Sequence, residues 1–371
     1  MSSVSPKAAP RESAASRARV IVPTLCVGIL ASADSALAHG EPRDRIAVAA
    51  AAVEVGAVES ACRARGWRTT HIPASPDPRR TRAALEREKP DVVFHLAESV
   101  GGDSRVESLL AALLEGLGLP YTGSGSKALW AGLHKPIARK KLAAAGVAVP
   151  EGFVLETARS PVPRAFRRLA KARWIVKPSR EDASHGIAIE SVVSGEKAVR
   201  ERAAFVIRTY AQPALVEEFI EGREFNVSIL EGANGPRVLP LAEIDFEKFP
   251  KGAPRLVTFA SKWMKASAEF RGTPSIAARR TAPGTARAIR EAAKAAWKAL
   301  GLRDYGRVDI RIGEDGEPRV LDVNPNPDVS PGSGLSKAAE RDGLTHEELI
   351  AGIVESALRR ARSRAASAAA I

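Results

Sequence analysis

The sequence has few cysteines, few aromatic residues and no long apolar run. Two cysteines, Cys26 and Cys62, are too few for the disulfide framework of small secreted domains, and neither stands in a metal-ligand spacing. We expect both to be small buried residues of a protein in a reducing cytoplasm. No stretch approaches the roughly 20 apolar residues that a membrane-spanning helix needs, so we predict no membrane partner.

Positive charge is in excess, with a formal net charge of +13. Much of the excess lies near the two ends, in residues 7–19 and 359–364, and aromatic residues make up only 5% of the chain. The basic stripe interleaved with aromatics that is typical of nucleic-acid binding is missing. We therefore predict a solvated basic surface that attracts small anions, and no nucleic-acid partner.

The apolar segment Val20–Ala31 has two interpretations. Basic residues precede it, and Ala36-Leu37-Ala38 looks like a signal-peptidase site. However, Pro23 interrupts the apolar stretch, and cleavage would remove a first strand from the domain that follows. We favour a first strand over Arg19–Ile29, a disordered tail over residues 1–18 and a cytoplasmic location.

Strand and helix patterns alternate in the first third of the chain. After the first strand, we expect helices at 43–65, 80–88 and 105–117 and strands at 67–72 and 91–96. This alternation predicts a parallel sheet with helices on both sides, a Rossmann-like layer. Ser104 and Glu107 have the spacing of a capping box for the third helix. The apolar face of that helix is predicted to be Val106, Leu109, Leu113 and Leu117.

The rest of the chain predicts a mixed arrangement. We expect helices at 130–145 and 285–300, strands at 153–155, 174–176, 186–192, 215–219 and 225–230, and a long loop at 246–272. The strands 215–219 and 225–230 are expected to be neighbours. A hairpin is predicted from Val308–Ile312 and Arg319–Val323. A last helix begins near Thr345, whose spacing to Glu348 fits a capping box.

Charged side chains interrupt this otherwise apolar hairpin. Asp309 lies on its first strand, and Asp322 and Asn324 lie two residues apart on its second. Period-two geometry puts Asp322 and Asn324 on one face, where side chains of paired strands meet. Two carboxylates and an amide oxygen suit Mg²⁺, particularly beside phosphate oxygens. Arg307 would point to the same face. A polar strand surface is the alternative, but the apolar flanks indicate burial, where unpaired carboxylates are costly.

A strand that ends in Lys177 is suited to hold a phosphate. The small residues after it include Ser184 and Gly186. A lysine holds phosphate as a point charge, and small residues let backbone N–H groups surround the oxygens. A surface hairpin is the alternative.

The segment Glu217–Glu224 is suited to hold adenosine. Phe219 and Ile220 offer an apolar slot for the base, and the two terminal glutamates suit the base amine and the ribose hydroxyls. A charged turn without function is the alternative.

Taken together, these stretches resemble the ATP-grasp superfamily, and within it the D-alanine–D-alanine ligase family, from about residue 90 to 358. The matching motifs are Leu119–Ser124, Lys135 in Leu133–Pro136, Ile175–Pro178, Glu217–Ile220 with Gly222 and Glu224, Lys262-Trp263, Gly306–Asp309, and Asn324 followed by Pro327. The resemblance implies an α/β ATP-grasp fold with a Rossmann-like N-terminal domain, a small α+β central subdomain and an α+β catalytic subdomain. The expected domain limits are 19–125, 126–214 and 215–361, with tails at 1–18 and 362–371.

The resemblance also implies a two-step reaction. A substrate carboxylate would attack the γ-phosphate of ATP, and an amine would then displace phosphate from the acyl phosphate. The implied nucleotide contacts are Lys135, Lys177, Ser184, Glu217, Phe219, Ile220, Glu224 and Lys262. Asp309, Asp322 and Asn324 would hold one or two Mg²⁺ or Mn²⁺ ions, and Arg307 and Lys262 would be catalytic. The family is often dimeric through its N-terminal domain, so a homodimer is also implied.

Departures from the family pattern cluster on the substrate side. The segment Leu30–Glu41 lacks the glycine- and serine-rich loop with its glutamate for the substrate ammonium, and Ala183 stands where the family has a serine. Asp328 replaces a glycine whose backbone serves the substrate carboxylate, and Asp322 replaces a longer, metal-bridging glutamate. The implied substrate contacts are Glu98, Trp263, Asp328 and Ser333.

Three functions follow in order of preference. The first is an ATP-dependent carboxylate–amine ligase that joins amino acids or small peptides. The second is an authentic D-alanine–D-alanine ligase of peptidoglycan synthesis, which the substrate-side departures disfavour. The third is a non-catalytic, nucleotide-binding regulatory protein, disfavoured because competent residues occupy every phosphate and metal position.

Overall fold

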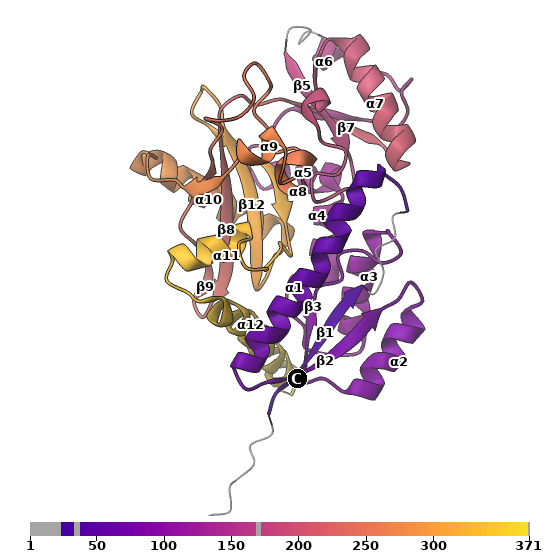
Figure 1. The fold of residues 1–371 in the computed structure, drawn as a ribbon, viewed down its shortest axis with the longest axis vertical. Helices are drawn as coiled ribbons and strands as arrows, with labels where there is room; N and C mark the ends of the chain where they lie inside the picture. Colours follow the sequence, from indigo (N-terminus) through magenta and orange to yellow (C-terminus); the bar gives the residue numbers. More distant parts are fainter. Residues whose placement is uncertain (1–23, 33–37, 168–171, 370–371) are drawn as a thin grey trace, which may run out of the picture.

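The computed structural model describes residues 24–32, 38–167 and 172–369. The predicted tail at 1–18, the start of the predicted first strand and most of Ala36-Leu37-Ala38 lie outside these residues. The described chain builds three sheets. Figure 1 shows the first sheet at the lower right, the second at the top and the third on the left. Among the described helices, none is both long and apolar enough to cross a membrane.

The first sheet is parallel, with strand order β2-β1-β3. Its strands are β1 (Cys26–Ser32), β2 (Arg68–Ala74) and β3 (Val92–His95). A short 3-10 turn (Pro42–Asp44) leads into α1 (Arg45–Ala64), and α2 (Pro78–Glu88) and α3 (Arg105–Gly116) follow. The Rossmann-like prediction is confirmed for this part of the chain. Cys26 and Cys62 are both buried and free, as expected.

The predicted start and apolar face of α3 are partly wrong. Ser104 makes no capping hydrogen bond; instead Asp103 Oδ1 accepts from Arg105 N at 2.9 Å. The Glu107 carboxylate points away from the helix start and accepts from Asn326 at 3.3 Å. Leu109, predicted to be buried, is 64% exposed, because the buried face of α3 is shifted by one residue and contains Leu110 and Leu114 instead.

The helix predicted at 130–145 is two helices. They are α4 (Ser126–Leu133) and α5 (Lys135–Ala144), separated by His134 with φ −85° and ψ 80°. Pro136 sits in the first turn of α5, where its missing N–H costs nothing, but it cannot continue a helix from upstream. The break makes Lys135 the first residue of a new helix.

The second sheet has the strand order β4-β7-β5-β6. Its members are β4 (Gly152–Leu155), β5 (Arg173–Pro178), β6 (Val192–Ser194) and β7 (Ala214–Glu218), with α6 (Arg164–Arg167) and α7 (Glu196–Tyr210) beside them. The strand predicted at 186–192 is wrong: Gly186 has φ +70°, and a 3-10 turn at Ile189–Ser191 precedes β6. Ser191 stabilises that turn by accepting from Ala188 N at 3.0 Å.

The third sheet has the order β11-β10-β8-β12-β13, with β9 paired to β8. Its strands are β8 (Arg223–Gly232), β9 (Gly235–Val238), β10 (Ala242–Ile244), β11 (Ser275–Ala277), β12 (Tyr305–Ile312) and β13 (Pro318–Asn324). The hairpin prediction is confirmed. The predicted pairing of segments 215–219 and 225–230 is wrong, because β7 and β8 belong to different sheets and a short linker passes from one to the other.

The remaining helices either lie between strands of the third sheet in the sequence or form the C-terminal end of the chain. The segment predicted as a loop at 246–272 contains α8 (Phe259–Trp263) and α9 (Ala268–Arg271). The predicted helix at 285–300 is α10 (Pro283–Leu300), which ends at Gly301 with φ +72°. After α11 (Gly334–Arg341), α12 (His346–Ala369) begins with the predicted capping box, since Thr345 and Glu348 exchange hydrogen bonds of 2.8 and 3.2 Å.

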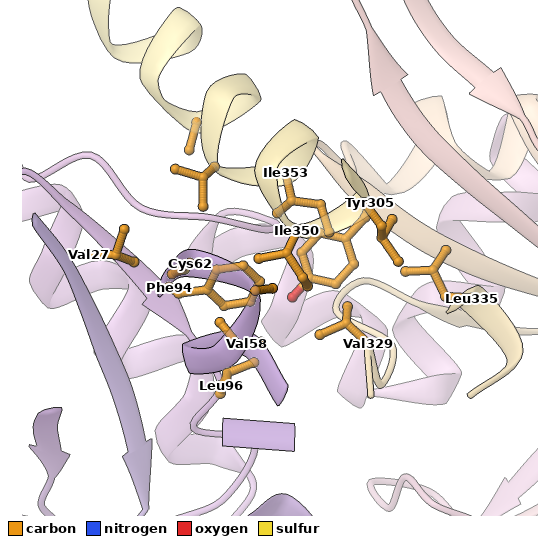
Figure 2. Packing of buried hydrophobic residues seen from close by; sticks show 14 of the residues in the cluster. Val27, Val58, Cys62, Phe94, Leu96, Tyr305, Val329, Leu335, Ile350 and Ile353 are labelled. Carbon is orange, nitrogen blue, oxygen red and sulfur yellow. The ribbon is translucent and has the colours of Figure 1, made fainter. Parts of the chain in front are cut away.

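One apolar core joins the first sheet to the third. In Figure 2, Phe94 of β3 and Val58 of α1 lie against Ile350 of α12, with Tyr305 and Val329 beside them. All five side chains are fully buried. Burial stabilises each large apolar side chain by about 1.5–3 kcal/mol relative to exposure. This core therefore holds the loops after β3 and after β13 close together.

Gly222 of the linker between β7 and β8 allows a close approach of two backbone segments. Its φ is +145°, and a Cβ there would lie 1.9 Å from the Ile312 carbonyl oxygen. We predict that Gly222→Ala lowers the free energy of unfolding by about 2 kcal/mol or more, from backbone strain together with the clash. Urea denaturation measures the change.

The matched control is Gly316→Ala. Gly316 also has a positive φ, +77°, but nothing lies within 4 Å of a Cβ added there. We expect only the strain cost of about 1 kcal/mol for this variant. Equal losses for the two variants would contradict the role of the Ile312 contact.

Candidate active site

Three neighbouring strands of the third sheet place polar side chains in one row. Asp309 on β12 lies opposite Asp322 on β13, and Arg307 lies opposite Asn324. On the other side of β12, Asn226 of β8 lies opposite Asp309. Asn226, Asp309 and Asp322 therefore cross the sheet side by side, with Arg307 on the same face two residues along. The sequence predicted the two carboxylates but not Asn226.

Asp309 is held from three directions. Arg307 donates from Nε and Nη2 to its two carboxylate oxygens at 2.8 and 2.9 Å. Asn226 Nδ2 donates to Oδ1 at 2.7 Å, and Asn324 Nδ2 donates to Oδ2 at 3.2 Å. Burial alone would raise the pKa of Asp309, but the Arg307 guanidinium outweighs it and the pKa is lowered. The carboxylate of Asp309 is therefore charged at neutral pH.

Asp322 is paired with Lys135. Lys135 Nζ donates to Asp322 Oδ2 at 2.7 Å and lies 3.7 Å from Asp182 Oδ1. The Lys135 side chain is buried, which by itself would lower its pKa, but Asp322 and Asp182 raise the pKa above its ordinary value. Lys135 is thus a fixed cation between the hairpin and the loop after β5.

Lys177, at the end of β5, meets Glu217 of β7. Its Nζ lies 2.5 Å from Glu217 Oε2, and Arg139 of α5 pairs with the other oxygen, Oε1. Lys177 is 7% exposed and Glu217 is 2% exposed. The carboxylate therefore balances two cations, and a nucleotide that contacts Lys177 must share it with Glu217.

The linker between β7 and β8 forms an apolar slot beside a buried ion pair. Phe219 and Ile220 are each 8% exposed. The Arg311 guanidinium lies 5.0 Å from the Phe219 ring centroid, a cation–π contact. Arg311 also donates to Glu224 Oε2 at 2.9 and 2.7 Å and to the Ile220 carbonyl at 2.7 Å. Both contacts of Arg311 with Glu224 use the same carboxylate oxygen, Oε2.

The loop at 182–187 lies against α8. Ala183 and Ser184 have φ values of +54° and +60°, uncommon for residues other than glycine. Trp263 donates from its indole nitrogen to the Ala183 carbonyl at 3.0 Å, and Phe259 N donates to the Ile187 carbonyl at 2.9 Å. Two hydrogen bonds inside the loop keep this shape, since His185 N donates to the Asp182 carbonyl and Ile187 N to the Ser184 carbonyl, each at 3.0 Å.

Lys262 is brought toward the hairpin by α8. Burial lowers the pKa of its ammonium, and the Arg307 guanidinium lowers it further, while Asp309 and Asp322 act in the opposite direction. Its neighbours are thus the same charged groups that form the row on the third sheet. Trp263, the next residue, uses its polar atom to hold the 182–187 loop, so its predicted substrate contact remains a prediction.

Two of the predicted substrate residues come together, and a third is occupied elsewhere. Glu98 follows β3 and Asp328 follows β13. The Glu98 side chain is exposed. Partial desolvation by the surrounding protein, and then the carboxylates of Asp182 and Asp328, raise the pKa of Glu98 to about 7. Ser333 is the N-cap of α11, where its hydroxyl accepts from Ser336 N at 3.2 Å.

With this geometry established, similarity to known proteins identifies the family. A family model described as the D-ala D-ala ligase C-terminus matches residues 143–355. The chain is 33% identical over 307 residues to the D-alanine–D-alanine ligase of Gluconobacter oxydans, covering 81% of this chain and 91% of that one. It is 32% identical over 271 residues to the uncharacterized protein y4sG of Sinorhizobium fredii, covering 72% and 75%.

The chain belongs to the D-alanine–D-alanine ligase family. The crystal structure of the D-alanine–D-alanine ligase from Bacillus anthracis in complex with ATP has the same fold, with a TM-score of 0.70 at 20% identity over 92% of this chain and all of that one. The ATP-grasp prediction is thereby confirmed. As a member of this family, the protein is an ATP-dependent, ADP-forming ligase that joins amino acids through a carbon–nitrogen bond.

Four charged or polar residues near the predicted site residues were not identified from the sequence patterns. Arg139 lies one helical turn after Lys135, so helical spacing pointed to it. Asn226 and Arg311 lie on alternating positions of β8 and β12 that share a sheet face with Asp309, but their partners depend on which strands pair. Asp182 is in a loop whose shape the sequence does not determine.

The buried pair of Arg311 and Glu224 is expected to contribute strongly to stability. Arg311 is 2% exposed and Glu224 is 7% exposed. We predict that Arg311→Met lowers the free energy of unfolding by about 3–5 kcal/mol, because it leaves a buried carboxylate without its cation. Chemical denaturation followed by tryptophan fluorescence measures the loss.

Arg319 provides the control on the neighbouring strand. It lies opposite Arg311 in the β12–β13 ladder and pairs with Asp315 at 2.5 Å on the exposed edge of the hairpin. Because solvent screens that pair, Arg319→Met should change stability far less. A loss for Arg319→Met as large as that for Arg311→Met would contradict the distinction between the two pairs.

Proposed function

We propose that the ligase activates a substrate carboxylate by phosphorylation and that its charged row on the third sheet is the reaction centre. A carboxylate oxygen attacks the γ-phosphorus of ATP, ADP leaves, and an acyl phosphate forms. The amine nitrogen then attacks the carbonyl carbon and loses a proton, and phosphate departs with the oxygen that came from the carboxylate. The observation that carries the proposal is the row of Asn226, Asp309 and Asp322, flanked by Arg307 and Lys135.

This reaction requires the protein to position the reactants and to neutralise the charge of the phosphates. Lys135 and Lys177 are proposed to hold the α- and β-phosphates, since both are buried cations: Lys135 lies 3.7 Å from Asp182 of the loop after β5, and Lys177 lies at the end of β5 itself. Lys262 is proposed to contact the γ-phosphate from α8. Arg307 is proposed to stabilise charge on the acyl phosphate and on the tetrahedral intermediate, because its guanidinium is held rigidly by Asp309.

The proposed adenosine site is the linker between β7 and β8. Phe219 and Ile220 would face the base, Glu217 its amine, and Glu224 Oε1 the ribose. The Ser184 backbone, at φ +60°, would supply an N–H toward phosphate oxygens.

The donor set also fits a divalent cation. Asp309 and Asp322 supply two carboxylates and Asn324 an amide oxygen, all hard oxygen ligands suited to Mg²⁺ or Mn²⁺. Within the described ranges, no group of three or more histidine, cysteine, aspartate or glutamate side chains is placed to bind a metal. Phosphate oxygens of ATP would therefore have to complete the coordination of one or two ions. A bound cation would neutralise phosphate charge and would share the carboxylates with Arg307 and Lys135.

We also propose that the ligase acts in the cytoplasm, where ATP is available, and that it forms a homodimer through its N-terminal part. Exposed apolar side chains on α1 support the second proposal: Ile46 and Val53, seven residues apart and so on the same side of the helix, are 47% and 67% exposed. Such residues are candidates for an interface when they lie close together.

An ADP-release assay with Mg²⁺ and pairs of amino acids, dipeptides and hydroxy acids tests the proposed function. ADP and phosphate should appear only when both a carboxylate substrate and a nucleophile are present. Measurable ATP binding with no turnover across the whole panel would instead favour a regulatory, non-catalytic protein. Efficient use of D-alanine alone would favour an authentic D-alanine–D-alanine ligase.

Asp309 provides a direct test of the metal and phosphate assignments. We predict that Asp309→Asn lowers kcat by about 100-fold or more, because it removes a negative charge that would hold the divalent cation and that positions Arg307, with a smaller effect on ATP affinity. Steady-state kinetics and ATP titration measure the two effects. Asp315→Asn, in the turn of the same hairpin, should retain activity; wild-type turnover by Asp309→Asn would refute the assignment.

A further inference from the structure

We propose that Tyr210, the last residue of α7, is a positioning residue for the phosphates of ATP. It would hold the 182–187 loop at a fixed distance from the segment at residues 40–44, which precedes α1. Through this contact the first sheet would help to set the place of the phosphates, although they would bind beside the second sheet. The inference rests on the proposed function, because it takes the 182–187 loop as a phosphate contact.

Two hydrogen bonds join the segment at 40–44 to the end of α7, and Figure 1 shows the start of α1 beside that end. Gly40 N donates to the Thr209 carbonyl at 3.0 Å. Tyr210 OH donates to Asp44 Oδ2 at 3.2 Å, the nearer of two carboxylates. Glu41 N donates to the same Asp44 oxygen at 2.9 Å, which fixes the acceptor within its own segment. Tyr210 and Asp44 are 2% and 1% exposed, so water hardly competes for this bond.

The Tyr210 ring lies between two glycines from distant parts of the chain. A Cβ added at Gly40 would lie 3.2 Å from Cε1 of the ring, and one added at Gly186 would lie 2.9 Å from Cε2. Their φ values are +109° and +70°, and glycine adopts such values without strain. The ring therefore acts as a spacer between the segment at 40–44 and the 182–187 loop.

Two further side chains attach the 182–187 loop to the end of α7. Arg202 of α7 donates from Nη2 to the Gly186 carbonyl at 2.8 Å. Gln212, just after the helix, accepts from Arg180 N at 2.6 Å and donates to Glu181 Oε1 at 2.8 Å, both directly before the loop. The loop is thus bonded to α7 on both sides. A contact that fixes the end of α7 also fixes the loop.

The segment at 40–44 also reaches α8, which carries Lys262. The Arg43 guanidinium lies 5.8 Å from the centroid of the Phe259 ring, within the range of a cation–π contact. The His185 ring lies 5.7 Å from the same ring. Phe259 is the first residue of α8 and is 1% exposed. The segment therefore supports both the loop and the helix that are proposed to contact phosphate.

Tyr210→Phe tests the role of the hydroxyl, because it keeps the ring between the two glycines. Calorimetric titration of the full chain with Mg²⁺ measures the affinity for a non-hydrolysable ATP analogue, and competition measures the affinity for adenosine. We expect the Kd of the analogue to rise about fivefold or more, because the loop spends less time in the arrangement that binds phosphate. The Kd of adenosine, which lacks phosphates, should change by less than about twofold. An unchanged Kd of the analogue, or an equal rise for adenosine, would overturn the inference.

Two variants of Asp44 test its role as the acceptor. Asp44→Asn keeps an oxygen that can accept from Tyr210 OH and from Glu41 N, so the affinity for the ATP analogue should stay near that of the wild type. Asp44→Ala removes the acceptor and should weaken binding at least as much as Tyr210→Phe. Adding Tyr210→Phe to Asp44→Ala should then cause no further loss, because both changes remove the same hydrogen bond. Additive losses would contradict a shared role.

Tyr121→Phe is the matched control. Tyr121 is 3% exposed and also donates its hydroxyl to a carboxylate, Glu115 Oε1, at 2.6 Å. Both partners lie within seven residues of chain at the end of α3, so this bond joins no distant segments. The variant should change the Kd of the ATP analogue by less than about twofold, whatever it does to stability. A rise equal to that of Tyr210→Phe would show a general effect of buried tyrosines and would overturn the inference.

The same measurements separate this inference from the proposed function. A wild-type chain that binds the ATP analogue but releases no ADP with any substrate pair would refute the ligation mechanism. The effect of Tyr210→Phe on the analogue would still decide the inference in that case. Equal affinities of the wild-type chain for adenosine and for the analogue would refute the phosphate contacts of the 182–187 loop, and the inference with them.

Discussion

Two carboxylates that face each other across one hairpin must be neutralised, and much of the structure supplies the charges that do so. Asp309 and Asp322 are direct neighbours on β12 and β13. Arg307 balances the first, and Lys135 balances the second from another part of the chain. The break of the helix at His134 places Lys135 there, at the start of α5. ATP and a divalent cation would enter a site whose charged groups are already fixed, which reduces the reorganisation needed for catalysis.

The apolar core of Figure 2 fixes the two loops that carry the proposed substrate contacts. Phe94 and Ile350 join the first sheet to α12, and Val329 packs into the same core directly beside Asp328. The loop after β3, which carries Glu98, is thereby held against the loop after β13. In the proposed site, Lys177 and Glu217 of the second sheet would contact the nucleotide. The phosphates would then lie on the side of the second sheet, and the substrate on the side of the first.

Local patterns predicted the elements well, and pairing between distant segments was harder to predict. The capping box at Thr345, the end of α10 at Gly301 and the hairpin of Asp309 and Asp322 depend on residues close in sequence, and all three are confirmed. The pairing of β7 with β5 rather than β8 depends on contacts across many residues. Similarly, Glu107 has the spacing of a helix cap but bonds to Asn326, more than 200 residues away. The partners of Lys135, Glu217 and Glu224 could not be predicted because a charge pattern does not specify which opposite charge lies nearest.

Transfer of oxygen from the carboxylate to phosphate tests the proposed chemistry most directly. The ligase is supplied with ATP, Mg²⁺, an amine substrate and a carboxylate substrate labelled with ¹⁸O, and the released phosphate is analysed by ³¹P NMR. The acyl-phosphate mechanism predicts one labelled oxygen in the phosphate for each bond formed, together with ADP. Unlabelled phosphate, or release of AMP and pyrophosphate, would contradict it.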